Sequence, residues 1–241
     1  MKNLMKFAIA IVLVATTFLS NAQIKFGVKV GLNLADIAQN FKDSEVESDT
    51  KMLTGYAFGV TAEYEIQEKW ALQSGVMLTR KGYKVENSSA ESNWSESYER
   101  KYKVNYLEVP VNIAYKMNDF QLYAGPYVAF GISGKVKEEW TETYNGETES
   151  DSFECDIKFK SEVGEEDFDD DNDDEYMRGF DYGLNFGVGY QTGPMLFNVG
   201  YSLGLANLTP DKKGEDGFDA KDYKSSNRVL SFSVSYFFGK K

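Results

Sequence analysis

Two alternating runs within residues 104–133 most constrain what this chain can fold into. In each run apolar residues occupy every second position, which is the pattern of a β-strand with two different faces. The apolar positions of the first run are Leu107, Val109, Val111, Ile113 and Tyr115. Those of the second are Leu122, Ala124, Pro126, Val128, Phe130 and Ile132. The polar break Met117-Asn118-Asp119 between the runs predicts a β-hairpin.

The other face of this hairpin identifies its surroundings. A soluble sheet turns Lys and Glu toward water, whereas this face is mostly Gly, Ala, Asn, Ser and Tyr. Small and weakly polar side chains fit the crowded interior of a narrow barrel, and the apolar face then meets lipid. A soluble eight-stranded barrel of the lipocalin kind is the alternative. It needs a large apolar interior, which faces rich in Gly and Ser cannot supply.

The same two-faced pattern recurs along the whole chain. Besides the hairpin, strands are expected over residues 24–34, 56–66, 70–79, 180–191, 195–205 and 230–238. Each is as long as the 9–11 residues that a tilted membrane strand needs, or slightly longer. With the two strands of the hairpin, the chain contains eight such segments.

The connections between these segments alternate in length. Short breaks begin at Gln67, Met117 and Gln191, and long polar connections cover residues 36–52, 81–103, 135–177 and 207–227. Membrane barrels of bacteria have short periplasmic turns, long external loops and an even number of strands. The sequence therefore predicts an all-β, eight-stranded antiparallel up-and-down transmembrane β-barrel, with both termini periplasmic.

The N-terminus has the pattern of a secretory signal peptide. Lys2 and Lys6 precede an apolar run of 13 residues, and Ser20 and Ala22 fit cleavage before Gln23. The alternative is a membrane anchor, for which 13 residues are too few. We therefore expect a signal peptide at 1–22 and a barrel domain at 23–241. Cleavage leaves a net charge of −14, since two of the 26 Lys and Arg residues are lost.

The composition argues against catalysis and against nucleic-acid binding. The chain has no His and a single Cys, Cys155, so Ser-His-Asp and Cys-His arrangements and disulfides within the chain are excluded. The glycines recur at strand spacing and do not form a phosphate-binding motif. A strongly acidic chain has no basic surface for nucleic acid. We expect no enzymatic activity, no cofactor and no specific metal site.

The connection over residues 135–177 is the most acidic part of the chain. It contains 18 Asp and Glu residues and four Lys. An EF-hand starting at Asp167 fails, because Asn172 and Arg178 stand where Gly and Glu are required. A solvated, mostly disordered external loop that is dispensable for folding is expected. Loose binding of divalent cations or of a basic partner is the alternative, with Asp169, Asp171, Asp173 and Glu175 as weak candidate ligands.

Several motifs resemble a known group of proteins. They are Gly27-Val-Lys-Val-Gly-Leu-Asn33, Asn105-Tyr-Leu-Glu-Val-Pro110, Tyr123-Ala-Gly-Pro-Tyr127, Arg178-Gly-Phe-Asp-Tyr-Gly183 and the last strand. With these the chain resembles the PorT-like, porin-family outer-membrane β-barrel proteins over essentially its whole mature length. The resemblance implies an outer-membrane barrel, and the family name suggests transport or secretion. One departure is the tail, since Gly239-Lys240-Lys241 follows the Phe238 with which such barrels usually end.

Placing the apolar faces in lipid forces several charged residues into the lumen. The inward charges are Lys25, Lys29, Glu63, Glu65, Glu108 and Asp181. Opposite charges should pair there, so we expect a charge cluster of Lys29, Glu63, Glu108 and Asp181, with Lys29 opposite Glu63. A side-chain-filled lumen favours a structural or surface-interaction role, with a narrow passive pore and an accessory part in secretion as alternatives. The expected partners are outer-membrane lipid, lipopolysaccharide and the barrel assembly machinery.

Overall fold

Long antiparallel strands make up almost the whole computed structural model, which describes residues 24–41, 50–167, 174–213 and 223–238. The predicted signal peptide at 1–22 lies outside the described residues. Eight strands form the barrel wall: β1 (Ile24–Phe41), β2 (Thr50–Gln67), β3 (Trp70–Glu91), β4 (Trp94–Met117), β5 (Phe120–Tyr144), β9 (Phe180–Thr192), β10 (Met195–Gly204) and β12 (Tyr223–Phe238). The remaining elements are β6 (Glu147–Phe159), β7 (Glu162–Val163), η2 (Glu165–Asp167), β8 (Glu175–Met177) and β11 (Asp211–Lys212).

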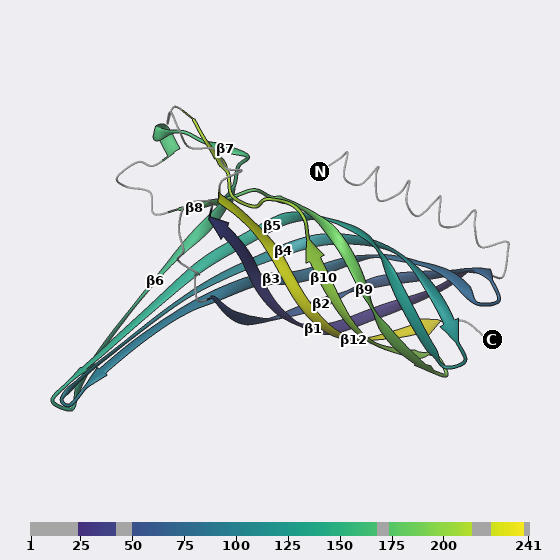
Figure 1. Cartoon of the computed structure of the whole chain (residues 1–241), viewed down its shortest axis with the longest axis horizontal. Coiled ribbons are helices and arrows are strands. Elements are labelled where there is room, and N and C mark those ends of the chain that lie inside the picture. The colour runs from purple at the N-terminus through teal and green to yellow at the C-terminus, as the bar shows by residue number, and fades with distance from the viewer. Residues whose placement is uncertain (1–23, 42–49, 168–173, 214–222, 239–241) are drawn as a thin grey trace.

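The eight long strands close into a barrel. Each pairs antiparallel with its neighbour in the order β1-β2-β3-β4-β5-β9-β10-β12, and β12 pairs with β1 to complete the ring (Figure 1). The predicted eight-stranded up-and-down barrel is confirmed. Closure leaves no free edge in the barrel wall, so every backbone polar group there can bond to a neighbouring strand.

The two ends of the barrel differ. Short turns join β2 to β3, β4 to β5 and β9 to β10, and the first and last strands end beside them, where Phe26 pairs with Phe238. Asn118 adopts a left-handed conformation (φ 55°) in the second of these turns, as Asn tolerates. We call this the turn end, and the opposite end, which carries β6, β7, β8 and β11, the loop end.

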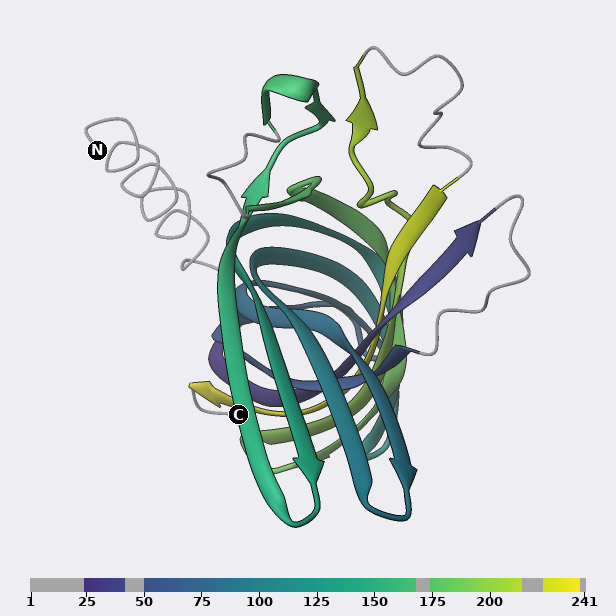
Figure 2. The same cartoon turned by 90° about the vertical axis from the view of Figure 1, so that its left-hand side faces the viewer.

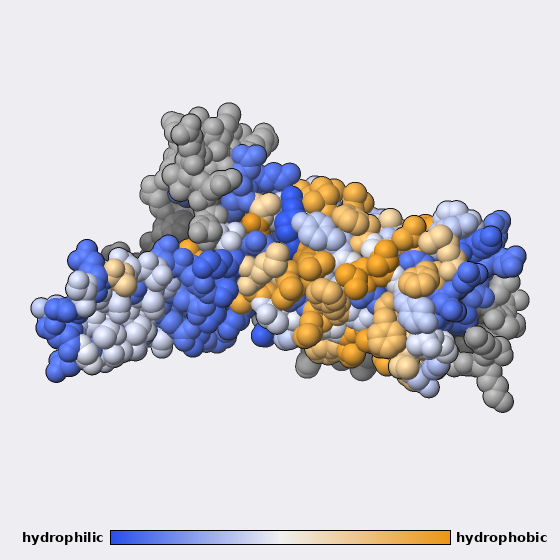
Figure 3. Space-filling model, turned by 60° about the horizontal axis from the view of Figure 1, so that its bottom comes forward, coloured by the Kyte–Doolittle hydropathy of each residue, from blue (hydrophilic) through white to orange (hydrophobic). Residues whose placement is uncertain are grey.

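The barrel is apolar outside and polar inside. Leu32 and Val60 on its outer surface are 60% and 57% exposed, whereas Glu63 and Asp181 are completely buried. On the side of the barrel seen in Figure 3, apolar residues form an orange band between two blue ends. This arrangement inverts that of a soluble protein and matches a wall surrounded by lipid. No helix among the described residues is long and apolar enough to cross a membrane.

Glycines on the inner face make room for large lumen side chains. A Cβ atom at Gly200 would lie 2.1 Å from the hydroxyl of Tyr123, and one at Gly187 would lie 2.6 Å from it. A Cβ at Gly183 would lie 2.8 Å from the ring of Tyr127. These glycines thus serve close packing, as the sequence predicts.

The strands at the loop end are longer than the sequence predicts. The connections expected at 81–103 and 135–177 are largely strand, because β3, β4 and β5 continue past the barrel and β6 extends their sheet. Residues 83–102 and 136–155 form a four-stranded sheet that projects as two hairpins (Figure 2); we call it the arm. The expected disorder is therefore wrong for the described part of 135–177. Continuous backbone pairing with the barrel wall orders these strands despite their charge.

Residues near the base of the arm pack against the mouth of the barrel. Val104, Tyr106, Tyr127, Val136 and Ile157 form a buried apolar cluster. Phe159 and Met177 pack against this cluster from β6 and β8. The segments around β8, β7 and β11 thus lie at the loop end and are fastened to the barrel.

Candidate functional site: a closed lumen and a projecting sheet

A buried ionic network blocks the lumen near the loop end. Lys81 of β3 lies 2.8 Å from the Glu108 carboxylate of β4 and 2.9 Å from that of Asp181 on β9. Asn227 of β12 donates a hydrogen bond of 2.9 Å to Asp181, and the Lys81 ammonium stands 4.2 Å from the ring centre of Tyr127. Because five strands contribute to it, this network ties opposite walls of the barrel together.

A second network fills the lumen at the turn end. The Glu63 carboxylate of β2 is 2.6 Å from the Lys116 ammonium of β4 and 3.8 Å from that of Lys25 on β1. Both lysines also contact Glu65, at 3.0 and 2.6 Å. Gln73 donates a hydrogen bond of 2.8 Å to Glu63. Further amides continue the network toward β10.

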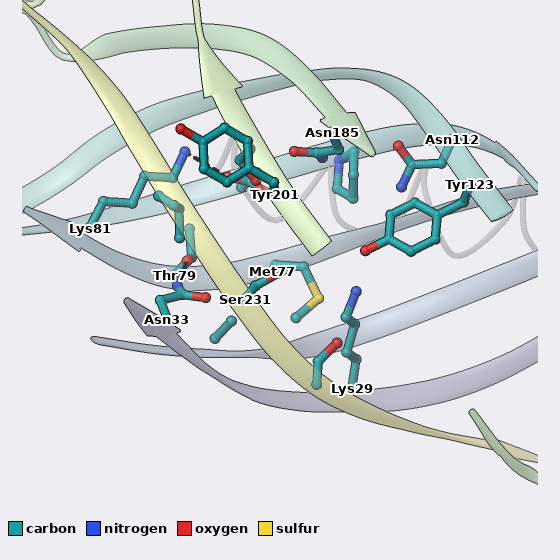
Figure 4. Close-up of a pocket in the computed structure, with 16 residues that line it drawn as sticks. Lys29, Asn33, Met77, Thr79, Lys81, Asn112, Tyr123, Asn185, Tyr201 and Ser231 are labelled. Atoms are coloured by element: carbon teal, nitrogen blue, oxygen red, sulfur yellow. Dashed lines mark hydrogen bonds and ion pairs between the residues drawn. The ribbon is translucent and has the colours of Figure 1, made fainter. Parts of the chain in front are cut away.

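Between these two networks lie small polar cavities around Lys29. One of about 60 Å³ lies toward the loop end and one of about 30 Å³ toward the turn end, and Lys29 lines both. Figure 4 shows Lys29, Tyr123, Asn112 and Asn185 reaching into the larger cavity from different strands. The side-chain oxygens of both asparagines are buried without a hydrogen-bond partner. Polar cavities of this size hold a few water molecules and do not form a channel.

The structure places the four predicted lumen charges in three different surroundings. Glu108 and Asp181 meet around Lys81, and Glu63 lies in the turn-end network. The expected pairing of Lys29 with Glu63 is wrong, because the register sets Lys29 opposite Gly59 and Lys25 opposite Glu63.

Sequence reasoning missed the two lysines that hold the networks together. The alternation places Lys81 in a long connection and ends the neighbouring strand at Tyr115, before Lys116, but both side chains point inward. The signal for Lys81 is its spacing, since Thr79 and Lys81 continue the inward alternation of β3. Lys81 is buried, and Lys116 is partly buried, with 18% of its side chain exposed.

The candidate metal ligands do not form a site in the described residues. Asp169, Asp171 and Asp173 lie outside the described residues, and Glu175 of β8 forms an ion pair with Arg100 of β4. Within the described part of the chain, no group of three His, Cys, Asp or Glu side chains could hold a metal ion.

One face of the arm, continuous with the lumen side of the barrel, is aromatic and acidic. Successive cross-strand rows on it are Tyr102–Val136–Cys155, Arg100–Glu138–Phe153, Tyr98–Trp140–Asp151, Glu96–Glu142–Glu149 and Trp94–Tyr144–Glu147. The indole N–H groups donate diagonally, from Trp94 to Glu142 at 2.7 Å and from Trp140 to Glu96 at 2.9 Å. We call this the aromatic face.

The opposite face of the arm is electrically balanced. Glu139 lies 2.8 Å from Lys137 and 3.1 Å from Lys101, and these contacts lower the pKa of Glu139 to about 2. Nearer the tip, hydroxyls pair across the strands, with Thr141 and Ser150 at 3.2 Å. We call this the hydroxyl face.

These features define an integral membrane β-barrel with a closed lumen and an ordered surface extension. The chain matches the model of the "Outer membrane protein beta-barrel domain" over residues 20–209, and it belongs to that family. It is therefore an integral outer-membrane protein. No curated protein matches it.

Solved structures of other outer-membrane proteins resemble it distantly. Neisserial surface protein A is 15% identical, with 88% of this chain and 97% of that chain covered and a TM-score of 0.43. The attachment invasion locus protein Ail of Yersinia pestis is 10% identical, with coverages of 90% and 99% and a TM-score of 0.38. OprG of Pseudomonas aeruginosa is 13% identical, with coverages of 91% and 97% and a TM-score of 0.32.

Proposed function

We propose that this protein is a non-catalytic surface-interaction barrel, in which the membrane domain is a rigid anchor and the arm makes the contacts. The supporting observation is that the lumen is closed at two levels by buried ionic networks while the sheet continues beyond the barrel. The lumen of a pore would contain a continuous path of water. Here lumen side chains brace the wall instead, and the longest strands reach outward.

The proposal includes an orientation. We place the arm outside the cell and both termini in the periplasm, because short turns of such barrels face the periplasm. Lys103 and Lys135 lie opposite each other on β4 and β5 at the base of the arm, and Lys135 also forms an ion pair with Glu154. We place these two lysines at the level of the phosphate groups of lipopolysaccharide. Lipopolysaccharide is thus a proposed partner, and recognition of the last strand by the assembly machinery is a second.

The single cysteine offers a test of this orientation. Cys155 lies on the arm and is half-buried, and burial raises the pKa of its thiol. A membrane-impermeant maleimide should therefore label intact cells, faster at pH 8.5 than at pH 7. Labelling that needs permeabilised cells would contradict an external arm.

The second candidate is a narrow pore, favoured by the hydrated cavities around Lys29. Membership of the PorT-like group, with an accessory part in secretion, stays a prediction from sequence motifs. Conductance in planar bilayers separates pore from anchor. We expect no steady current from the wild type, and openings to appear when Lys81 and Lys116 are both replaced by alanine. A steady wild-type current would show that the networks do not close the lumen.

A further inference from the structure

Among the described residues, the outer edge of β6 from Glu147 to Asp156 is unpaired, and it lies on an exposed part of the arm. Residues 147–156 pair with β5 on one side. On the other side the only described partner of β6 is β8, and the pairing with β8 begins at Ile157. Every residue from Glu147 to Glu154 is exposed. The backbone groups along this edge can therefore bond to an added strand, which is a common mode of peptide recognition.

Another strand of the same chain already pairs with this edge further along β6. β8 adds to it in parallel through Ile157, Lys158 and Phe159. The edge is thus straight enough to accept a strand, and the stretch toward the tip continues in the same sheet.

The turn at the tip determines which backbone groups point outward. Asn145 and Gly146 both have positive φ, 49° and 88°, as in a two-residue type I′ turn. Such a turn makes Tyr144 and Glu147 a hydrogen-bonded pair, so odd-numbered residues of β6 bond to β5. The N–H groups of Thr148, Ser150 and Ser152 therefore point to the free edge, where that of Ser152 donates a hydrogen bond of 2.7 Å to the Asp151 carboxylate.

The side chains along the edge select the charge of an added strand. Glu147, Glu149 and Asp151 share the aromatic face and have no ion-pair partner among the described residues. Glu149 lies directly opposite Glu142 on β5, and like charges in such pairs destabilise a sheet. The lysines of the arm cannot relieve this repulsion, because they lie on the hydroxyl face, where Lys101, Lys135 and Lys137 are bound to other glutamates.

We propose that residues 147–156 of β6 accept an extended, lysine- or arginine-rich segment of a partner protein by strand addition. This inference rests on the proposed surface-interaction function and deepens it. The segment would carry basic residues at every second position, facing Glu147, Glu149 and Asp151. Small polar residues would stand between them, beside Thr148, Ser150 and Ser152. A second copy of β6 fits poorly, because it would set acidic residues against acidic residues.

The test uses the full mature chain in nanodiscs and a fluorescent ten-residue peptide of alternating Lys and Thr. Ser150→Pro/Ser152→Pro removes two outward N–H groups, of which that of Ser152 also bonds to Asp151, and leaves the bonds to β5 intact. Ser150→Ala/Ser152→Ala is the matched control. We expect the proline pair to weaken peptide binding at least about tenfold, and the alanine pair to bind like wild type. Glu149→Gln/Asp151→Asn should also weaken binding about tenfold.

A second peptide tests strand addition on the wild-type protein, in case the proline variant misfolds. It has the same sequence with alternate backbone nitrogens methylated, and wild-type protein should bind it about tenfold more weakly. Equal binding of both peptides, or of both serine variants, would show plain charge attraction and overturn strand addition. Absence of peptide binding to the wild-type protein, or dimerisation of the protein through this edge, would also overturn the proposal. The bilayer conductance experiment is independent, so failure here leaves the closed-lumen anchor standing.

Discussion

Lys81 is the residue on which the closed lumen most depends. It is 2% exposed and neutralises two carboxylates, those of Glu108 and Asp181. Removing one member of a buried ionic group leaves an uncompensated charge in a poorly solvated place. This destabilises the fold more than replacing the whole group by apolar residues would.

We therefore expect Lys81→Met to lower the free energy of unfolding by roughly 3–5 kcal/mol. Methionine keeps most of the length of the side chain, so the effect reports mainly the charge. Urea unfolding in lipid vesicles measures it. Lys29→Met is the matched control and should cost less, because no described carboxylate forms an ion pair with Lys29. Equal losses in the two variants would contradict the assigned role of Lys81.

On the arm, Glu139 offers a residue-level test by titration. Hydrogen bonds from Lys137 and Lys101 lower its pKa from 4.5 to about 2. A lowered carboxyl pKa means that the contact stabilises the arm above about pH 4.5 and is lost as the pH falls toward 2. Carboxyl carbon NMR shifts should show this titration, and Lys101→Gln/Lys137→Gln should move it back up. A midpoint near 4.5 in the wild type would show that these lysines do not hold Glu139.

At the scale of the element, the β5–β6 hairpin has two parts with different roles. Its base carries Val136 and Ile157, which are buried against the mouth of the barrel. Its tip is exposed on both faces. The sequence-based expectation that residues 136–176 are dispensable for folding therefore needs revision.

We expect deletion of residues 136–176 to destabilise the barrel, because the apolar cluster at the mouth loses Val136, Ile157 and Phe159. Deleting only 141–144 and 147–150 keeps Asn145-Gly146 as the turn between Trp140 and Asp151, and should leave stability nearly unchanged. Heat-modifiable migration on gels and urea midpoints distinguish the two variants. Equal stability of both would mean that the mouth cluster contributes nothing.

Sequence alternation predicts the wall of the barrel well because each strand within lipid has two chemically different faces. It places Glu63, Glu108 and Asp181 inward correctly. It fails beyond the membrane, where both faces are polar and the alternation of apolar and polar residues stops, although Asn145-Gly146 is a strong hairpin signal. It also fails to predict which residues lie opposite each other on neighbouring strands, since inner faces of Gly and Ser do not specify register. Lys29 lies opposite Gly59, four residues from the predicted Glu63.

At the scale of the whole molecule, the apolar band determines where the protein resides. Val111 lies on the outer surface of β4 and is 42% exposed, in the region expected near the bilayer centre. Val111→Arg should cost about 2–4 kcal/mol of folding free energy in lipid. Vesicle unfolding measures this loss, and Ser150→Arg at the arm tip is a control expected to cost little. A harmless Val111→Arg, or mature protein in the soluble periplasmic fraction, would contradict the membrane assignment.

The unbroken course of β3, β4 and β5 from barrel to tip has a mechanical consequence. From Val104 to Trp94 the strand extends about 30 Å without interruption. A tensile load applied at the tip along the strands is shared as shear by many ladder hydrogen bonds at once, and it passes directly into the closed wall. A partner bound to β6 would thus pull on a stiff sheet that is continuous with the barrel in the outer membrane. Under load, the hydrogen bonds between the partner and β6 would break before the barrel unfolded.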